Sequence, residues 1–334
     1  MNKKVAIVIP TFNRAGMVTR AIDTALAQTY PCQVIVCDHG SSDNTPEVIK
    51  EYGDKVIYIR KEKDFGISFC WLDGILHTEA DYVHLHLDDD WMEPTYIEEC
   101  VKYLEDEKVG MVFSDANLYD MVHDKCYPNC LNVQSVFGTG IFDVEKLEKE
   151  VLEHAFMLSP AACLYRRQDI IDAVYPGNLP IDFGGVYKGV GPDHFMTLLC
   201  LLRYKKVASV GKSLVTFAAH DGSITIDAHG NNDKAVKMAA AYNAVRKYYK
   251  LLKYYLENQE AVDDFGNAKQ KRKTLRVKIM GIPFWKVSEK GDKTRYSLFG
   301  IPLGKAKITS KKSNYYFLGL PICSVKRLSL IHIS

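Results

Sequence analysis

Three adjacent carboxylates are the first feature of this sequence that could do chemistry. They are Asp88, Asp89 and Asp90, within the stretch YVHLHLDDDWMEP at residues 82–94. Like charges at neighbouring positions repel and raise one another's pKa, so a cation among them would lower the cost of keeping them together. The acids indicate either a solvated turn or a divalent-cation site, because Mg²⁺ and Mn²⁺ prefer oxygen ligands.

The elements that must position these acids follow from four apolar runs, which we predict to be buried strands. The runs are residues 5–9, 34–36, 56–59 and 82–87. Helical segments separate them, and Asn13 is placed to cap the first of these helices, while Thr45, followed by Pro46, is placed to cap the second. Strands that alternate with helices predict βαβ units and a parallel, doubly wound sheet.

Polar residues stand at the predicted carboxyl ends of three of these strands. Pro10 and Thr11 end the first strand, Asp38 ends the second, and the three acids end the fourth. Ligands of such sheets bind outside the carboxyl ends of the strands. We therefore expect these groups to meet in one crevice.

The composition is that of a globular protein, with 47% hydrophobic and 25% charged residues among 334. The longest apolar run, near residues 195–202, is too short to span a membrane, and the N-terminal run is too short for a signal peptide. Among nine cysteines only Cys126 and Cys130, near His123, approach zinc-ligand spacing, and no second pair completes them. Scattered free thiols predict a reducing, cytoplasmic location.

Charge is divided unevenly along the chain. Residues 1–266 carry 27 Lys and Arg against 39 Asp and Glu, whereas residues 267–334 carry 16 against 2. The basic end contains three Gly-x-Pro units spaced 19 residues apart, at Gly281, Gly300 and Gly319. Each unit predicts a strand, a break and a second strand, and such hairpins must stack to be stable.

These patterns predict four regions. Residues 1–230 form an α/β domain, 231–266 a helical linker, and 267–327 a basic tail of β-repeats. Residues 328–334 do not continue the third repeat, and we expect them to be a non-native end. In the linker, an apolar stripe along residues 238–252 predicts packing against the domain.

Short motifs in the first two thirds of the chain resemble those of family 2 glycosyltransferases with the GT-A fold. IVIPTFNR, CDHGSSDNT and LDDDW followed by Pro94 are similar to the family's donor half. Gly191-Pro-Asp193 and His220-Asp-Gly-Ser-Ile-Thr225 are similar to its acceptor half. The resemblance implies a mostly parallel, Rossmann-like sheet. It also implies an inverting transferase that moves a sugar from a nucleotide-diphosphate sugar, with a UDP-sugar favoured, to a glycan or lipid-linked hydroxyl in surface-polysaccharide synthesis.

The same resemblance assigns roles to individual residues. Asp193 would be the catalytic base that takes the acceptor proton, and Asp90, Asp88 and His220 would hold Mg²⁺ or Mn²⁺ against the diphosphate. Asp38 would accept the N3–H of uracil or thymine. The residues expected to bind the nucleotide sugar are Pro10, Thr11, Asn13, Arg14, Asp38, Gly66, Asp88 and Asp89. The alternatives are a turn acid for Asp38, a helix cap for Asp193 and a structural histidine for His220.

The sequence departs from the family pattern at three points. His39 replaces the second acid of the base-recognition segment, and Pro192 replaces an acid before Asp193. Trp71 and Leu72 replace an Arg-Asn pair, so Arg14, Lys63 or the metal must meet the diphosphate charge. These departures keep open an alternative function, a non-catalytic nucleotide- or glycan-binding protein that retains the fold.

The basic tail has three candidate partners. Its cations and aromatic residues suit an anionic membrane surface, where lipid-linked acceptors lie, so we expect a peripheral enzyme on the inner face of the cytoplasmic membrane. Alternatively, residues 267–327 pair with the acidic body or with a second subunit. Nothing in the enzyme half requires nucleic acid, and none is expected.

Overall fold

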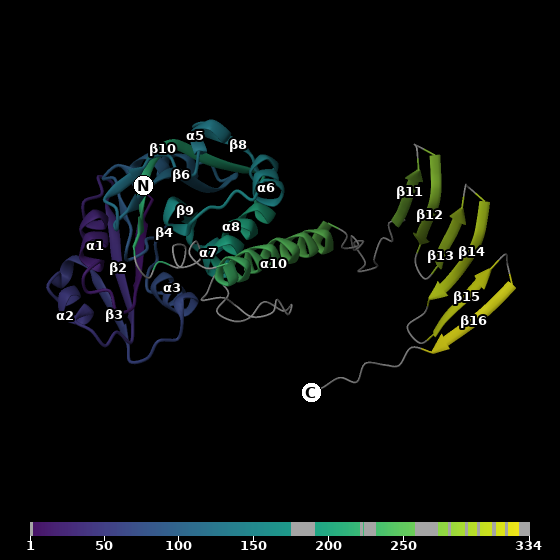
Figure 1. Ribbon diagram of the computed structural model, residues 1–334, viewed down its shortest axis with the longest axis horizontal. Helices are drawn as coiled ribbons and strands as arrows, with labels where there is room; N and C mark the ends of the chain where they lie inside the picture. Colours follow the sequence, from purple (N-terminus) through teal and green to yellow (C-terminus); the bar gives the residue numbers. More distant parts are fainter. Residues whose placement is uncertain are drawn as a thin grey trace. The chain divides into compact units, whose positions relative to one another are not determined.

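The chain forms two compact units, residues 1–253 and 254–334 (Figure 1). The first unit therefore includes part of the predicted helical linker. The computed structural model describes residues 3–174, 191–220, 223, 232–257, 273–279, 282–290, 293–298, 301–308, 312–317 and 320–326. The predicted non-native end and most of the segment after His220 lie outside these residues.

Four parallel strands form the first half of the central sheet, in the order β3-β2-β1-β4. They are β1 (Val5–Thr11), β2 (Cys32–His39), β3 (Ile57–Lys61) and β4 (Tyr82–Leu85). Each contains one of the predicted apolar runs or most of it. Buried β-branched residues fill β1 and the centre of β2, as expected for strands covered on both faces.

The second half of the sheet is mixed, continuing β4-β9-β6-β10-β5. Here β9 pairs antiparallel with β4 and β6, while β6 and β10 are parallel. The strands are β5 (Trp91–Met92), β6 (Val109–Asp120), β9 (Cys163–Arg166) and β10 (Lys206–Ala219), with β7 (Lys125–Tyr127) beside β6 and β8 (Gly140–Asp143) beside β10. The predicted parallel order therefore holds for the first half and for β6 with β10, and the antiparallel strand β9 interrupts it.

Helices cover both faces of this sheet, and two separate cores result. On one face lie α1 (Val18–Leu26), α2 (Thr45–Lys50) and α4 (Tyr96–Leu104). On the other lie α3 (Ile67–Leu76), α6 (Val144–Glu153), α7 (Arg167–Ala173), α8 (Pro192–Arg203) and α10 (Asn232–Glu257). Figure 1 shows α1 and α2 on one side of β2 and β3, with α3 on the other.

The long helix α10 packs onto the first unit through the stripe that the sequence predicted. Ala241, Val245 and Tyr249 are buried, and the Tyr249 hydroxyl lies 3.0 Å from Glu148 Oε1 on α6. A lysine one turn further, Lys253, reaches the same carboxylate. Apolar residues at this spacing share one helix face, which explains the docking.

Both predicted helix caps are wrong. The first helix begins at Val18, four residues beyond the predicted position, because Asn13 adopts a left-handed conformation (φ 54°) and its side chain accepts hydrogen bonds from the next loop. The second begins at Thr45 itself, with Asn44 as the preceding residue. The Thr45 hydroxyl instead accepts from the Arg14 backbone N–H at 2.9 Å.

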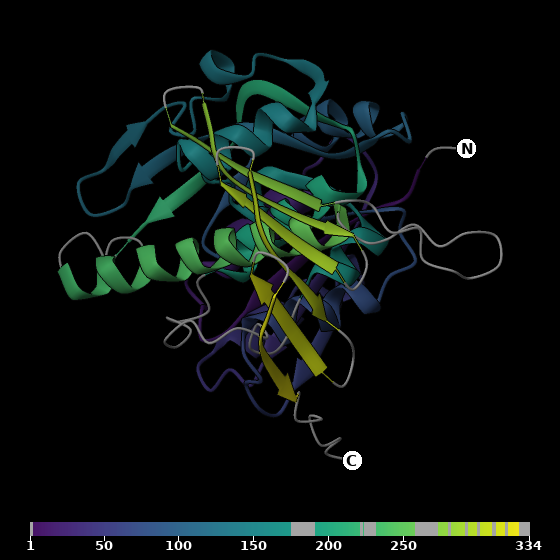
Figure 2. The ribbon, with the colours of Figure 1, turned by 90° about the vertical axis from the view of Figure 1, so that its right-hand side faces the viewer.

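The tail residues form a six-stranded antiparallel sheet in simple sequence order (Figure 2). Its strands are β11 (Lys273–Ile279), β12 (Ile282–Lys290), β13 (Lys293–Leu298), β14 (Ile301–Ile308), β15 (Lys312–Phe317) and β16 (Leu320–Lys326). Each Gly-x-Pro unit stands at the junction between an odd-numbered and an even-numbered strand. None of the helices in the described ranges is long and apolar enough to cross a membrane.

Candidate active site

Polar side chains meet at the carboxyl ends of β1 and β4. The Thr11 hydroxyl, at the end of β1, donates to Asp88 Oδ2 at 2.7 Å, across 77 positions of sequence. The contact exists because β1 and β4 pair in parallel, with Val8 opposite Leu85. The ends of β1 and β4 therefore bring these polar groups together, at the edge of the sheet where ligands of such folds bind.

The three acids have different surroundings. Asp90 is only 3% exposed, and its Oδ1 accepts a hydrogen bond from the Ala218 backbone N–H at 2.9 Å. Burial, and then the charges of Asp89 and Asp88, raise the pKa of Asp90 well above its usual range. Burial, followed by the Asp89 charge, raises the pKa of Asp88 to about 7.

The remaining acid, Asp89, contacts a histidine from the far end of the domain. Its Oδ2 lies 3.1 Å from His220 Nε2. The pairing of β5 with β10 places Trp91 opposite Thr216. Asp89, just before Trp91, and His220, just after β10, are therefore brought close together. Of the predicted metal ligands, His220 thus meets Asp89, whereas Asp90 is engaged with the backbone of β10.

Arg20 lies beside the same acids, although no sequence motif singled it out. Its guanidinium carbon stacks 3.7 Å from the centre of the Trp91 ring, and Nη2 donates to the Asp89 carbonyl at 3.2 Å. Burial lowers the pKa of Arg20, and the carboxylates of Asp90 and Asp89 oppose that shift. Nothing in the sequence around Arg20 distinguishes it from an ordinary arginine on a helix surface. The contact with Trp91 appears only in the folded chain.

Asp38 is fully buried, and protein groups occupy both of its oxygens. Oδ1 accepts from the Ser41 backbone N–H at 2.9 Å. Oδ2 accepts from the Tyr58 hydroxyl at 2.8 Å and from Arg60 Nη1 at 2.5 Å. This carboxylate therefore ties the loop after β2 to β3, and its contact with a nucleobase stays a prediction.

The neighbouring residue, His39, has an unused nitrogen. It is 2% exposed, with Nε2 3.4 Å from Asp73 Oδ2 and the Phe65 ring edge-on at a centroid distance of 6.2 Å. Within the described residues, Nδ1 is buried without a hydrogen-bond partner. A buried polar atom without a partner is costly and needs an explanation, so His39 is a candidate contact that the sequence reasoning treated only as a lost acid.

The other predicted donor-binding residues lie at the end of β1, in the loop that follows it and just before α3. Asn13 Oδ1 accepts from the Ser42 backbone N–H at 2.8 Å and so joins the loops after β1 and β2. The charge of Arg14 lies near Asp88, whose pKa it lowers in part. Gly66 has φ +89°, which favours glycine, and precedes α3. Pro10 is buried in β1.

Asp193 stands at the beginning of α8. Its Oδ1 accepts from the Gly191 backbone N–H at 3.0 Å, and the Tyr242 hydroxyl lies 3.5 Å from Oδ2. Burial raises the pKa of Asp193. The N-cap position of α8 is Gly191 and Asp193 lies in the first turn, so the alternative that Asp193 is the helix cap is wrong; its side chain is half-buried.

Trp71, which stands where the family pattern has an arginine, lies in the apolar core and not among the polar groups at the carboxyl edge of the sheet. It is 4% exposed and belongs to the core between α3 and the sheet, where Gly74 lets the helix approach: a Cβ there would lie 2.4 Å from Val8. Lys63 is exposed on the loop before α3. Among the described cations, Arg14 acts on the charge of Asp88 and Arg20 on that of Asp90.

The acids and His220 offer the ligand types that a divalent cation takes, but they do not form a closed cage. No three His, Cys, Asp or Glu side chains within the described ranges are grouped closely enough to hold an ion. That holds for the Cys126–Cys130 segment as well. Two carboxylates with raised pKa values, Asp88 and Asp90, nevertheless fit a nearby positive charge, since such a charge would lower both values.

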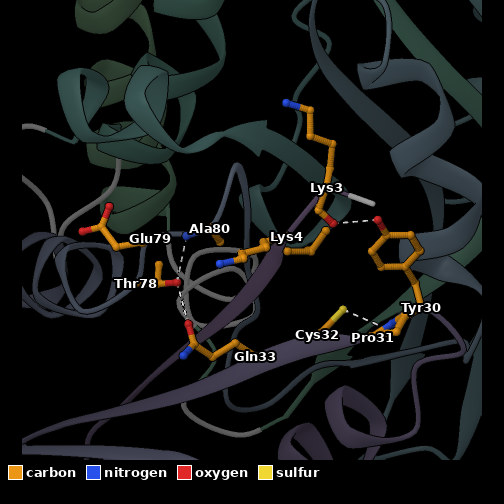
Figure 3. A pocket seen from close by; sticks show the side chains of 10 residues that line it. Lys3, Lys4, Tyr30, Pro31, Cys32, Gln33, Thr78, Glu79 and Ala80 are labelled. Atoms are coloured by element: carbon orange, nitrogen blue, oxygen red, sulfur yellow. Dashed lines mark hydrogen bonds between the residues drawn. The ribbon is translucent and has the colours of Figure 1, made fainter. Parts of the chain in front are cut away.

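A separate hollow of about 460 Å³ opens at the opposite, amino-terminal edge of β1 and β2 (Figure 3). Its polar groups bond to one another: the Thr78 hydroxyl donates to Gln33 Oε1 at 2.6 Å, and the Tyr30 hydroxyl to the Lys3 carbonyl at 2.6 Å. It brings together none of the acids described above. We assign it no chemistry.

Comparison with known proteins gives the family. The model of "Glycosyl transferase family 2" matches residues 6–172, half of the chain. Glycosyltransferase GlyA of Streptococcus pneumoniae is 24% identical over 242 residues, which are 67% of this chain and 32% of the relative. An uncharacterized glycosyltransferase of Rickettsia typhi is 35% identical over 126 residues, 37% of this chain and 39% of the relative. These matches span about a third of the length of the relatives.

The fold is similar to that of residues 1–349 of S. aureus TarS, solved in complex with UDP-GlcNAc. The TM-score is 0.52 at 16% identity, covering 76% of this chain and 73% of the other. This likeness confirms the predicted GT-A fold for the first unit. Together with the match over residues 6–172, it confirms the predicted family: the chain belongs to glycosyl transferase family 2, and those residues form its glycosyltransferase domain.

Proposed function

We propose that this chain is an inverting, metal-dependent glycosyltransferase that uses a nucleotide-diphosphate sugar. The observation that carries the proposal is the meeting of Asp89 and His220 at 3.1 Å, beside the Thr11–Asp88 hydrogen bond at the carboxyl edge of the sheet. Ligands of open α/β sheets bind at this edge. The two contacts join polar side chains that lie far apart in the sequence, from the ends of β1, β4 and β10.

A UDP-sugar is the favoured donor. TarS, whose fold is similar, was solved with UDP-GlcNAc, which supports a uridine nucleotide as the donor's carrier. Asp38 is already bonded within the protein, so we assign the contact with the base to His39. If His39 Nε2–H donates to Asp73, the neutral ring leaves Nδ1 as an acceptor for the N3–H of uracil or thymine.

Mg²⁺ or Mn²⁺ would be held by Asp89 and His220, with Asp88 close by. When bound, the ion would act as a Lewis acid for the charge that develops on the diphosphate. Arg20 and Arg14 would contribute positive charge on the protein side, and Arg20 is fixed there by Trp91. Asp90 acts through position: its bond to Ala218 holds the end of β10, and therefore His220, against the acids.

Asp193 is proposed as the catalytic base. A base for inverting transfer takes the proton of the acceptor hydroxyl as that oxygen attacks the anomeric carbon. Its raised pKa brings it closer to the value at which a carboxylate accepts a proton readily. The Gly191 N–H and the Tyr242 hydroxyl would orient the oxygens.

The acceptor is proposed to be a glycan or a lipid-linked sugar of a surface polysaccharide. The relatives support glycosyl transfer in general and are much longer than the matched segment, so the acceptor and the pathway rest on the resemblance of the motifs. Cytoplasmic location and peripheral attachment to the inner membrane face through residues 267–327 are part of the same proposal.

The test is a panel of UDP, dTDP, GDP and CDP, each with Mn²⁺ and with chelator, scored by thermal unfolding. A ligand that binds only the folded chain raises stability by about 2.7 kcal/mol at a hundredfold excess over Kd. We expect a metal-dependent shift with UDP. Release of UDP from UDP-sugars then separates an enzyme from a non-catalytic binding protein: binding without any release would favour the latter.

A further inference from the structure

The six tail strands carry two ladders of residues that lie on one face of their sheet. In an antiparallel sheet, directly paired residues lie on the same face and successive residues on opposite faces. The first ladder runs Thr274, Ser288, Arg295, Lys305, Tyr316 and Pro321, and the second runs Lys290, Lys293, Lys307, Asn314 and Ser324.

This face, here called the cationic face, carries ten basic residues. They occur on all six strands, and no Asp or Glu of the described strands shares the face with them. The ten are Arg276, Lys278, Lys286, Lys290, Lys293, Arg295, Lys305, Lys307, Lys312 and Lys326.

The opposite face is mainly apolar and aromatic. One ladder on it runs Leu275, Val287, Tyr296, Gly304, Phe317 and Leu320, and another passes through Val277, Trp285, Leu298 and Ile301. The charged residues of the described strands on this face are one opposed pair, Lys273 and Glu289. The repeat maintains the division, because Arg276 and Arg295 are 19 residues apart, as are Lys286 and Lys305.

We propose that the cationic face docks on the anionic surface of a lipid bilayer by electrostatic attraction, without insertion of the apolar face. Membrane attachment was proposed above for the tail as a whole. The cationic face now names the surface that binds and the mode of binding. It does not depend on which sugar the enzyme transfers.

The dimensions of the face favour a planar partner. Neighbouring strands lie about 4.8 Å apart, so six strands spread the cations over roughly 24 Å in one direction. Eight of the ten are lysines, whose compact, hydrated charges suit diffuse attraction to headgroups. A juxtamembrane basic residue contributes about 1 kcal/mol to binding of an anionic bilayer.

Single-stranded nucleic acid fits the face less well. Such ligands need aromatic residues interleaved with the cations for base stacking. The register places Tyr316 among the cations but Trp285, Tyr296 and Tyr315 on the opposite face, so aromatic residues are not regularly interleaved with the cations. The rest of the chain, with 27 basic against 39 acidic residues before position 267, would itself be repelled by an anionic surface, so attachment requires the tail.

The experiment is co-sedimentation of the full chain with vesicles of phosphatidylcholine alone and of equal parts phosphatidylcholine and phosphatidylglycerol. We expect binding to the anionic vesicles only, and its loss in high salt, where the screening length falls to about 3 Å. Neutralising four cations of one face (Lys286→Gln, Arg295→Gln, Lys305→Gln and Lys307→Gln) should weaken binding by on the order of a hundredfold or more.

A matched control neutralises four cations that lie outside the described strands, Lys269, Lys271, Arg272 and Lys311. An equal loss of vesicle binding in both variants would show that binding depends on net charge alone, and would overturn the assignment to the cationic face. Binding to neutral vesicles, or salt-resistant binding, would indicate insertion and overturn the mode. Stronger binding to oligonucleotide than to vesicles would overturn the partner. UDP binding, measured on the same variants, should stay unchanged and keeps this test separate from that of the glycosyltransferase.

Discussion

His220 Nε2 lies 3.1 Å from Asp89 Oδ2, although 131 positions separate the two residues. The contact depends on the antiparallel pairing of β5 with β10, which brings the strand leading to His220 alongside the two residues that follow the acids. Two halves of the domain, the one with the acids and the one with the histidine, are thereby joined at the predicted metal position. The relationship favours Asp89 over Asp90 as the direct ligand.

This assignment predicts opposite outcomes for two neighbouring substitutions. In Asp89→Asn, the Mn²⁺-dependent part of the UDP stabilisation should disappear, because a carboxylate ligand beside His220 is lost. In Asp90→Asn, most of it should remain, since the amide oxygen can still accept from Ala218 and the substitution removes only a buried charge. Thermal unfolding with UDP, with and without Mn²⁺, measures both.

The wild-type difference to compare with is about 2.7 kcal/mol at a hundredfold excess of ligand over Kd. Retention of the metal effect in Asp89→Asn, together with its loss in Asp90→Asn, would return the ligand role to Asp90. Both variants should otherwise unfold cooperatively, so that a change of fold is recognised separately.

How far the sequence predicted this structure depends on the range of the interactions. Runs of β-branched residues located β1 to β4, because local burial on both faces leaves that pattern. The cap at Asn13 was wrong because its side chain binds a loop almost thirty residues away, at Ser42. The bonds that occupy Asp38, and the stacking of Arg20 on Trp91, likewise arise only when separate strands and helices come together.

Asp38→Asn should destabilise the chain even without nucleotide. The variant leaves Arg60 without its buried carboxylate partner, and hydrogen bonds to charged groups contribute about 2 kcal/mol each. Tyr58→Phe, which removes one neutral donor to the same oxygen, should cost about 1 kcal/mol. Urea unfolding measures both. Wild-type stability of Asp38→Asn combined with lost UDP binding would instead support direct contact with the base.

Asp193→Asn should separate activity from stability. Loss of the base should slow transfer on the order of 10² to 10⁴-fold, while UDP binding persists. Because the pKa of Asp193 is raised, the folded chain holds this proton more tightly than the unfolded chain, so ionisation at neutral pH works against folding. The amide variant should therefore melt at or above the wild-type temperature. Tyr242→Phe is the mild control, and undiminished transfer by Asp193→Asn would exclude the residue as the base.

His84 should make the stability of the domain sensitive to acid. It is fully buried, its Nδ1 donates to the Cys163 carbonyl at 2.9 Å, and burial lowers its pKa to about 4. At neutral pH the ring is uncharged in both the folded and the unfolded chain. Below the ordinary histidine value of about 6.5, the unfolded chain takes up a proton that the folded chain refuses. The free energy of unfolding should then fall by about 1.4 kcal/mol per pH unit from this residue until the folded pKa is reached.

His84→Asn tests this account, because an asparagine amide can still donate to the Cys163 carbonyl but does not titrate. Denaturant unfolding at neutral pH and at about pH 5 should show a shallower loss of stability in the variant than in the wild-type chain. The exposed His154, which pairs with Glu150 on the surface of α6, provides the matched control as His154→Asn. If both variants lose stability with acid as steeply as the wild type, the buried ring does not carry the effect and other groups must.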